Sequence, residues 1–171
     1  MKNCILNYLI SLFFAGAAFG QAASDSLSEM AAQISPKDKS TIRSNRKQDE
    51  TAEATKRVSA DLQSKWIGKN VSIQFRLREV APSKLSDGRF SNEQFAWADD
   101  LKIGKGSTAV DVLFHALLPE AVATKGKSIA RGSLVTVSGK VTAIYVRPPV
   151  RNSGLILTLH LAADDIGVVK K

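Results

Sequence analysis

The amino-acid sequence predicts an all-β fold, a small β-barrel, because several segments carry the periodicity of strands. From Val71 to Leu77, apolar residues alternate strictly with polar ones, which is typical of a half-buried strand. The segment from Leu155 to Leu161 alternates in the same way. Residues 134–146 are rich in valine and long enough for a further strand, in which Gly139 is expected to form a β-bulge.

Residues 1–23 predict an export signal. They contain the basic Lys2, an apolar core over residues 5–14, and the small residues Ala18 and Gly20 before a cleavage site. We therefore expect an exported protein, periplasmic or secreted, with no stable membrane span after cleavage. The alternative is an uncleaved anchor, although the apolar run is shorter than the ~20 residues that span a bilayer. The single cysteine, Cys4, lies in this segment, so the mature chain is expected to have no disulfide.

Two segments of different character follow the signal. Residues 24–47 predict a flexible tether, because they are rich in small and charged residues and poor in large apolar ones. Residues 48–64 predict a helix, since they contain no glycine or proline and place Ala52, Val58 and Leu62 on a weak apolar stripe. The folded domain is expected to occupy residues 65–167.

The middle of that domain is less clearly marked. Asp87-Gly88 signals a turn, residues 90–99 could form a second strand, and the two glycines within residues 102–107 predict another turn.

Residues 108–118 fit two patterns: alternation predicts a strand, whereas the spacing of Val110, Leu113, Phe114 and Leu117 predicts a helix. Pro119 suits the first turn of a short helix.

The run Ile129–Val141 resembles the stretch "KGSxVxVxGxL" of bacterial single-stranded-DNA-binding proteins, which are OB-fold proteins. It is also similar to exported tRNA-anticodon-like OB domains. The resemblance covers about residues 66–166. It implies an OB-like barrel of five strands with one short helix between strands three and four. It thereby favours a strand for residues 108–118, and the helix of residues 48–64 becomes an N-terminal addition.

The resemblance also implies where a ligand would bind. Ligands of OB folds usually meet strands two and three and the loops after strands one and four. Cations beside aromatic rings there suit an anionic ligand with flat faces. The alternative is that Phe95 and Trp97 belong to the core and the arginines solvate loops. The candidate ligand-binding residues are Lys84, Arg89, Phe95, Trp97, Tyr145, Arg147 and Arg151.

The positive net charge of the chain also favours an anionic ligand. The formal net charge is +8, and from Lys65 to Lys171 sixteen basic residues stand against nine acidic ones. A basic domain favours polyanionic partners such as nucleic acid, an acidic polysaccharide, an anionic membrane face or an acidic protein. The alternative is that the charge serves solubility alone.

The sequence offers little for catalysis. His115 and His160 fall on outward positions of strands three and five, which are neighbours in an OB fold, so we expect them to lie close together. No short metal-ligand spacing accompanies them, and we predict no metal and no cofactor. The sequence has no GxSxG motif, no complete phosphate-binding loop and no activated cysteine, so an enzyme is not expected.

These observations predict an exported, non-enzymatic OB-like binding or scaffold module with a basic surface. Its partner would be an anionic polymer or a protein. The alternative is a protein that binds single-stranded nucleic acid. The ligand and the oligomeric state stay open.

Overall fold

The structure is a computed structural model that describes residues 25–44, 47–84, 89–106, 109–149 and 154–169. The predicted export signal lies outside the described residues. Within these ranges, no helix is both long enough and apolar enough to cross a bilayer.

The described residues form a mostly β fold with six strands, one more than the five predicted. The additional strand, β3, begins at Leu101 and is followed by Gly104, whose φ of 81° suits a turn. Residues 102–106, the described part of the predicted turn, therefore combine the end of a short strand with a turn. The strands are β1 (Asn70–Lys84), β2 (Phe90–Ala98), β3 (Leu101–Ile103), β4 (Val110–Leu118), β5 (Leu134–Arg147) and β6 (Leu155–Val168).

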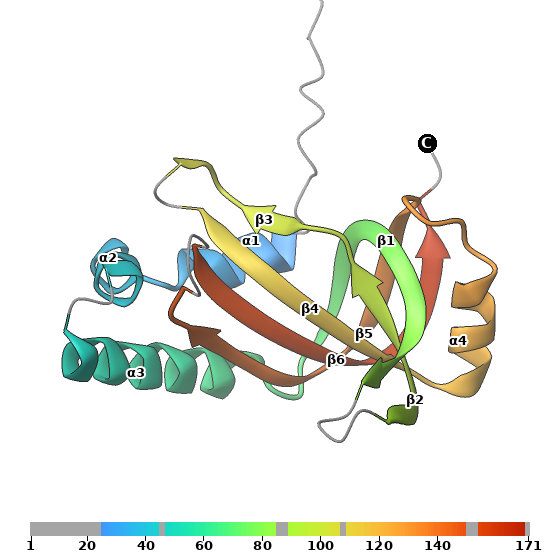
Figure 1. The fold of residues 1–171 in the computed structure, drawn as a ribbon, viewed down its shortest axis with the longest axis horizontal. Helices are drawn as coiled ribbons and strands as arrows, with labels where there is room; N and C mark the ends of the chain where they lie inside the picture. The colour runs from blue at the N-terminus through green and yellow to red at the C-terminus, as the bar shows by residue number, and fades with distance from the viewer. Residues whose placement is uncertain (1–24, 45–46, 85–88, 107–108, 150–153, 170–171) are drawn as a thin grey trace, which may run out of the picture.

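The strands pair in the order β2-β1-β5-β6-β4-β3, and β2 also pairs with β4 (Figure 1). This additional pairing links β1, β2, β4, β6 and β5 into a closed circuit of neighbouring strands. β4 and β6 run parallel, and the other pairs are antiparallel. Of residues 108–118, the structure places Val110–Leu118 in β4, which confirms the strand interpretation there.

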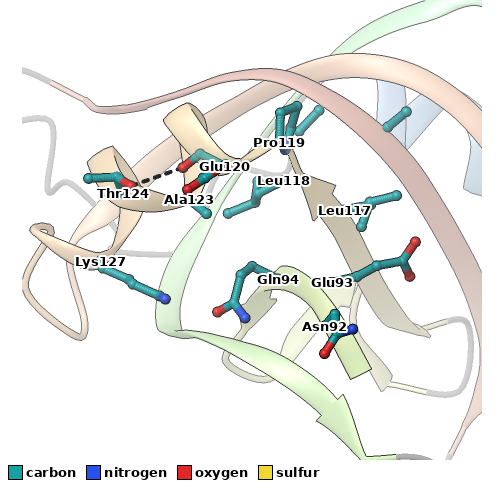
Figure 2. Close-up of a pocket in the computed structure, with 12 residues that line it drawn as sticks. Asn92, Glu93, Gln94, Leu117, Leu118, Pro119, Glu120, Ala123, Thr124 and Lys127 are labelled. Carbon is teal, nitrogen blue, oxygen red and sulfur yellow. Dashed lines mark hydrogen bonds between the residues drawn. The ribbon is translucent and has the colours of Figure 1, made fainter. Parts of the chain in front are cut away.

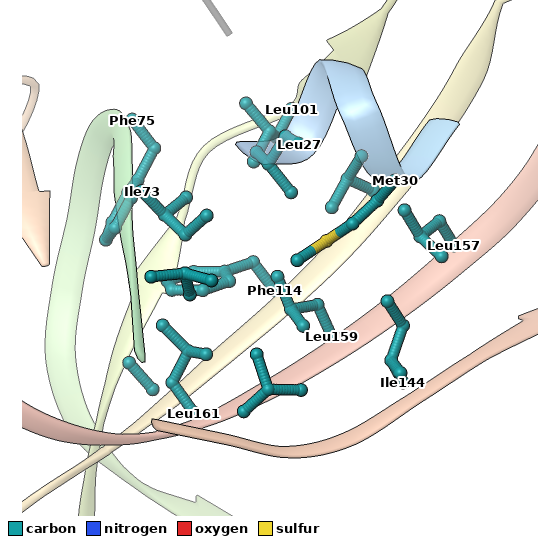
Figure 3. Close-up of a cluster of buried hydrophobic side chains, with 14 of the residues drawn as sticks. Leu27, Met30, Ile73, Phe75, Leu101, Phe114, Ile144, Leu157, Leu159 and Leu161 are labelled. Carbon is teal, nitrogen blue, oxygen red and sulfur yellow. The ribbon is translucent and has the colours of Figure 1, made fainter. Parts of the chain in front are cut away.

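The inner face of the strands carries the core. The predicted alternation in β1 is confirmed, because Val71, Ile73, Phe75 and Leu77 are all buried. The rings of Phe75 and Phe114 meet with centroids 4.9 Å apart. Figure 3 shows these side chains converging with leucines of β6 on the same interior space.

The prediction of a flexible tether over residues 24–47 is wrong for the part that the structure describes. Residues 25–44 contain two helices, α1 (Asp25–Ala32) and α2 (Pro36–Ser44). Leu27 and Met30 lie one helical turn apart and reach the core from α1, as Figure 3 shows. Ile34 and Ile42 are also buried. A few well-spaced apolar residues therefore suffice to dock a segment whose average composition is polar.

Two further helices, α3 (Gln48–Trp66) and α4 (Glu120–Lys127), bring the described helices to four rather than the two predicted. α3 matches the helix expected over residues 48–64 and packs beside β5. There the Ser59 hydroxyl accepts a hydrogen bond from the Val146 backbone N–H at 3.1 Å. α4 lies between β4 and β5 in sequence, as the resemblance implied, and Lys125 pairs with Asp165 of β6 at 2.6 Å.

Candidate ligand-binding face

Four rings form a line across the outer face of the sheet, and we call this set the aromatic row: Trp97, His115, His160 and Tyr145. Trp97 of β2 is in register with His115 of β4, and their ring centroids are 4.7 Å apart. His115 is in register with His160 of the parallel strand β6, at 4.9 Å. Tyr145 of β5 stacks on His160 at 6.2 Å. The row therefore crosses four strands, each of which contributes one ring.

Strand alternation puts these rings outside. Ala96 and Phe114, the neighbours of Trp97 and His115, point into the core and are at most 2% exposed, whereas the rings of the row are half-buried. The alternative interpretation that placed Trp97 in the core is therefore wrong. A hydrogen bond from Trp97 Nε1 to the Ala81 carbonyl, at 3.2 Å, holds the indole in place.

Each end of the row carries a further group from the predicted set. Phe95 lies beside Trp97 with centroids 6.2 Å apart. At the other end, the Arg147 guanidinium carbon lies 6.0 Å from the centre of the Tyr145 ring, within the range of a cation–π contact. A flat group placed on the row would therefore meet several rings and one cation.

The two histidines of the row are held neutral at neutral pH. Burial, followed by the charges of His160 and Arg147, lowers the pKa of His115 from 6.5 to about 4. Burial and Arg147 also lower the pKa of His160. Neutral imidazoles present flat polarisable faces rather than competing cations, which suits stacking.

A groove of about 530 Å³ borders the row on the side of β3, and we call it the β3 groove. Three cations, Arg78, Lys102 and Arg147, face three carboxylates there, so the groove is close to neutral in charge. Lys102 pairs with Asp111 at 3.1 Å. The predicted basic balance is therefore not concentrated at this place. The lining comprises Arg78, Trp97, Ala98, Asp99, Asp100, Leu101, Lys102, Asp111, Val112, Leu113, Phe114, Arg147 and Ile156.

A second hollow, of about 600 Å³, lies beyond the opposite side of the row between β2, β4 and α4, and we call it the α4 pocket (Figure 2). Its walls are mixed, with polar side chains from β2 and α4 and an apolar floor. They comprise Asn92, Glu93, Gln94, Leu117, Leu118, Pro119, Glu120, Ala123, Thr124, Lys127, Ala162 and Ala163.

The structure brings together only part of the predicted ligand-binding set. Phe95, Trp97, Tyr145 and Arg147 line up along one face, as described above. Lys84 instead lies at the end of β1, in register with Phe90, and Arg89 directly precedes β2. Arg151 lies outside the described residues.

Sequence reasoning left the two histidines out of the ligand-binding set, although it expected them to lie close together. The signal that could have placed them was their outward phase on adjacent strands, which is the same signal that aligns them with Trp97. Within the ranges that the structure describes, no three histidine, cysteine or acidic side chains group as metal ligands would.

The chain matches no protein-family model and no curated protein. Among solved structures it is similar to the small single-stranded DNA-binding protein of Streptomyces coelicolor. The two share 17% identity with a TM-score of 0.35, over 60% of this chain and 94% of that one. The mitochondrial single-stranded DNA-binding protein of S. cerevisiae is similar at 16% identity and a TM-score of 0.35, over 61% and 97% of the two chains.

An aspartyl-tRNA synthetase of Entamoeba histolytica is similar at 18% identity and a TM-score of 0.34. This match covers 64% of the present chain and only 20% of the synthetase. These matches include single-stranded-DNA-binding proteins, the first kind of protein that the sequence resemblance named, and a tRNA synthetase.

Proposed function

We propose that this protein is a non-enzymatic binding module that holds single-stranded nucleic acid against the aromatic row. The observation that carries the proposal is the continuous line of four rings across β2, β4, β6 and β5, with Arg147 at one end. Bases stack on aromatic side chains whatever their identity, because every base has a π face. In this proposal the closed circuit of strands is an OB-like barrel that keeps the row rigid.

The charges beside the row are consistent with moderate contacts to phosphate. Arg147 is exposed at the end of the row, whereas Lys102 is already paired with Asp111. Stacking would therefore supply more of the affinity than ion pairing. Salt should weaken binding less steeply than it does for proteins that neutralise many phosphates.

The proposal assigns no reaction to the two histidines. The carboxylate on the same face of β4, Asp111, accepts a hydrogen bond from the Gly154 backbone N–H at 2.7 Å and also pairs with Lys102. It is thus engaged away from the imidazoles, which supports a binding role for the row.

Fluorescence anisotropy with a labelled single strand of about twelve nucleotides, within the length range that OB folds cover, tests the proposal. We expect binding of the purified protein at roughly 50 mM salt and weaker binding at roughly 200 mM. Trp97→Ala should raise Kd about tenfold, since stacking contributes ~1–3 kcal/mol per base.

Phe90→Ala is the matched control. Phe90 is an aromatic residue of the same strand, is 64% exposed and lies at the start of β2 rather than in the row. Its replacement should leave Kd unchanged. Equal Kd values for Trp97→Ala and the unchanged protein would contradict the proposal. The absence of binding at low salt would also contradict it and would favour a protein or cell-envelope partner.

We further propose that the module acts outside the cytosol. This follows from the pattern of residues 1–23 described above, with Ala18 and Gly20 before the cleavage point. An exported module of this kind would meet nucleic acid, or another anionic polymer, in the periplasm or outside the cell.

A further inference from the structure

The α4 pocket borders the aromatic row. Side chains two residues apart in a strand lie on the same face. The next outward positions after His115 and His160 are Leu117 and Ala162, which are in register with each other. Both line the α4 pocket. The row and the pocket therefore meet at Leu117 and Ala162, whereas Gln94, two residues from the core-facing Ala96, lies on the other phase of β2 and lines a further wall of the pocket.

The polar groups in this pocket include several acceptors. Gln94 Oε1 is buried and has no hydrogen-bond partner among the described residues, a condition that is costly unless a donor reaches it. Glu93 and Glu120 add two carboxylates, and Lys127 supplies the one cation of the lining. Figure 2 shows the head groups of Gln94 and Lys127 extending into the space between β2 and α4.

The two carboxylates disfavour phosphate in this pocket, because like charges repel. The part of a nucleotide that can enter is therefore the base. In single strands the base edges are free to form hydrogen bonds with protein groups. The apolar floor, which includes Leu117, Leu118 and Ala123, suits the flat face of such a ring.

Resting on the proposed function, we propose that the α4 pocket is a guanine-selective subsite for a single strand bound on the aromatic row. Guanine carries N1–H and N2–H₂ donors beside the acceptor O6. Its donors match Gln94 Oε1 and the carboxylates, and O6 matches the ammonium of Lys127. Thymine offers a single N–H between two carbonyls, so it would leave more of the pocket's acceptors unpaired. A site built for hydrogen bonds discriminates against a ligand that leaves them unmade.

Anisotropy titrations with oligothymidine and with an alternating thymidine–guanosine strand of the same length test this subsite. The guanine-containing strand should bind about tenfold more tightly, in the range of a well-placed pair of hydrogen bonds to a base. Replacing its guanines by hypoxanthine, which lacks the N2 amino group, should remove much of that preference.

Two variants probe the two sides of the pocket. Gln94→Leu removes the buried acceptor at similar size, and Lys127→Ala removes the cation from an exposed position that does not endanger folding. Each should reduce the guanine preference to about one. Lys125→Ala is the control, because Lys125 is exposed on the same helix, pairs with Asp165 and does not line the pocket.

The outcomes separate the two proposals. Equal binding of both strands, still weakened by Trp97→Ala, would overturn the guanine subsite and leave the function of the row intact. A guanine preference that survives in both Gln94→Leu and Lys127→Ala would also overturn the assignment to this pocket. If neither strand binds at low salt, the proposed function itself fails, and the subsite fails with it.

Discussion

Single positions along β2 and β4 decide which side chains can meet a ligand. Ala96 and Phe114 face the core, while Trp97 and His115 face outward and touch each other. A shift of one residue in either strand would exchange these roles. In β4 the sequence showed which phase is buried. In β2 it did not, because Phe95-Ala96-Trp97 places large residues on one face and a small one on the other, and either face could be inside.

The histidine pair should make stability depend on pH. The folded-state pKa of His115 is lowered from 6.5 to about 4, chiefly by burial. The unfolded chain therefore binds a proton before the folded one does. The stabilisation is fully present above about pH 6.5 and is lost as the pH falls towards 4. Urea unfolding across this range should show a decline in the free energy of unfolding, and His115→Gln should flatten it. An equally steep decline in the variant would exclude His115 as the cause.

Gly139 should be irreplaceable for steric reasons. The ladder between β5 and β6 shifts register beside this residue, because Ser138 pairs with Asp165 and Gly139 with Ala163. The extra residue, Asp164, lies on β6, so the bulge stands opposite Gly139 and not on β5, where the sequence predicted it. A Cβ atom there would lie 2.2 Å from the Ala162 carbonyl oxygen and 2.7 Å from the Ala163 Cα. Both are backbone atoms that cannot move aside.

Gly139→Ala should therefore lower the melting temperature substantially, with a loss of ~1–3 kcal/mol or more as in other overpacked sites. Gly167→Ala is the control, since a Cβ on Gly167 of β6 meets no atom within 4 Å. Thermal melts followed by circular dichroism compare the two. Similar melting temperatures for both variants would contradict the steric explanation.

At the level of elements, the N-terminal helices belong to the fold. Composition suggested a tether, because averaging over residues 24–47 hides the spacing of the few apolar side chains. Leu27 and Met30 are completely buried against the strands. Whether such residues dock depends on an apolar surface supplied by distant parts of the chain, which no local pattern contains.

Met30→Ala should therefore destabilise the whole domain by ~2–5 kcal/mol, as is usual for truncation in a core. Glu29→Ala, one residue earlier and exposed, should have little effect. Urea denaturation midpoints provide the comparison. A Met30→Ala variant as stable as Glu29→Ala would mean that α1 is peripheral to the fold.

Local pattern also failed to decide whether residues 108–118 form a strand or a helix. Its apolar residues satisfied both helical and alternating patterns. The segment Val110–Leu118 forms strand β4 because its backbone groups pair with β6 on one side and with β2 and β3 on the other. Hydrogen bonding of a central strand is a property of its neighbours, so a single segment cannot predict it.

At the scale of the whole molecule, export is the prediction that most affects biology. We expect cleavage after Gly20, so that the mature protein begins at Gln21. Such cleavage would leave α1, which starts at Asp25, and the whole described core intact. Intact-mass spectrometry of the protein recovered from the periplasm or medium checks this. Recovery of the full-length chain in the cytosol alone would contradict it.

The net charge of the whole chain also differs from the charge balance at the β3 groove. The sequence carries a formal charge of +8, yet the β3 groove balances three cations with three carboxylates. Charges far apart in the sequence meet or separate only on folding, so the total could not locate a basic surface.

By itself, the sequence determined the mostly β character, the alternation of β1 and β6 and the nearness of His115 to His160. These depend on local periodicity, or on a pairing that the OB-fold resemblance already implied. Only the tertiary structure decided that α1 and α2 dock, that β3 exists, and that Trp97, His115, His160 and Tyr145 form one row. These features arise from contacts between segments that are far apart in the chain. The geometry of those contacts is fixed only when β2 pairs with β4 and closes the circuit of strands.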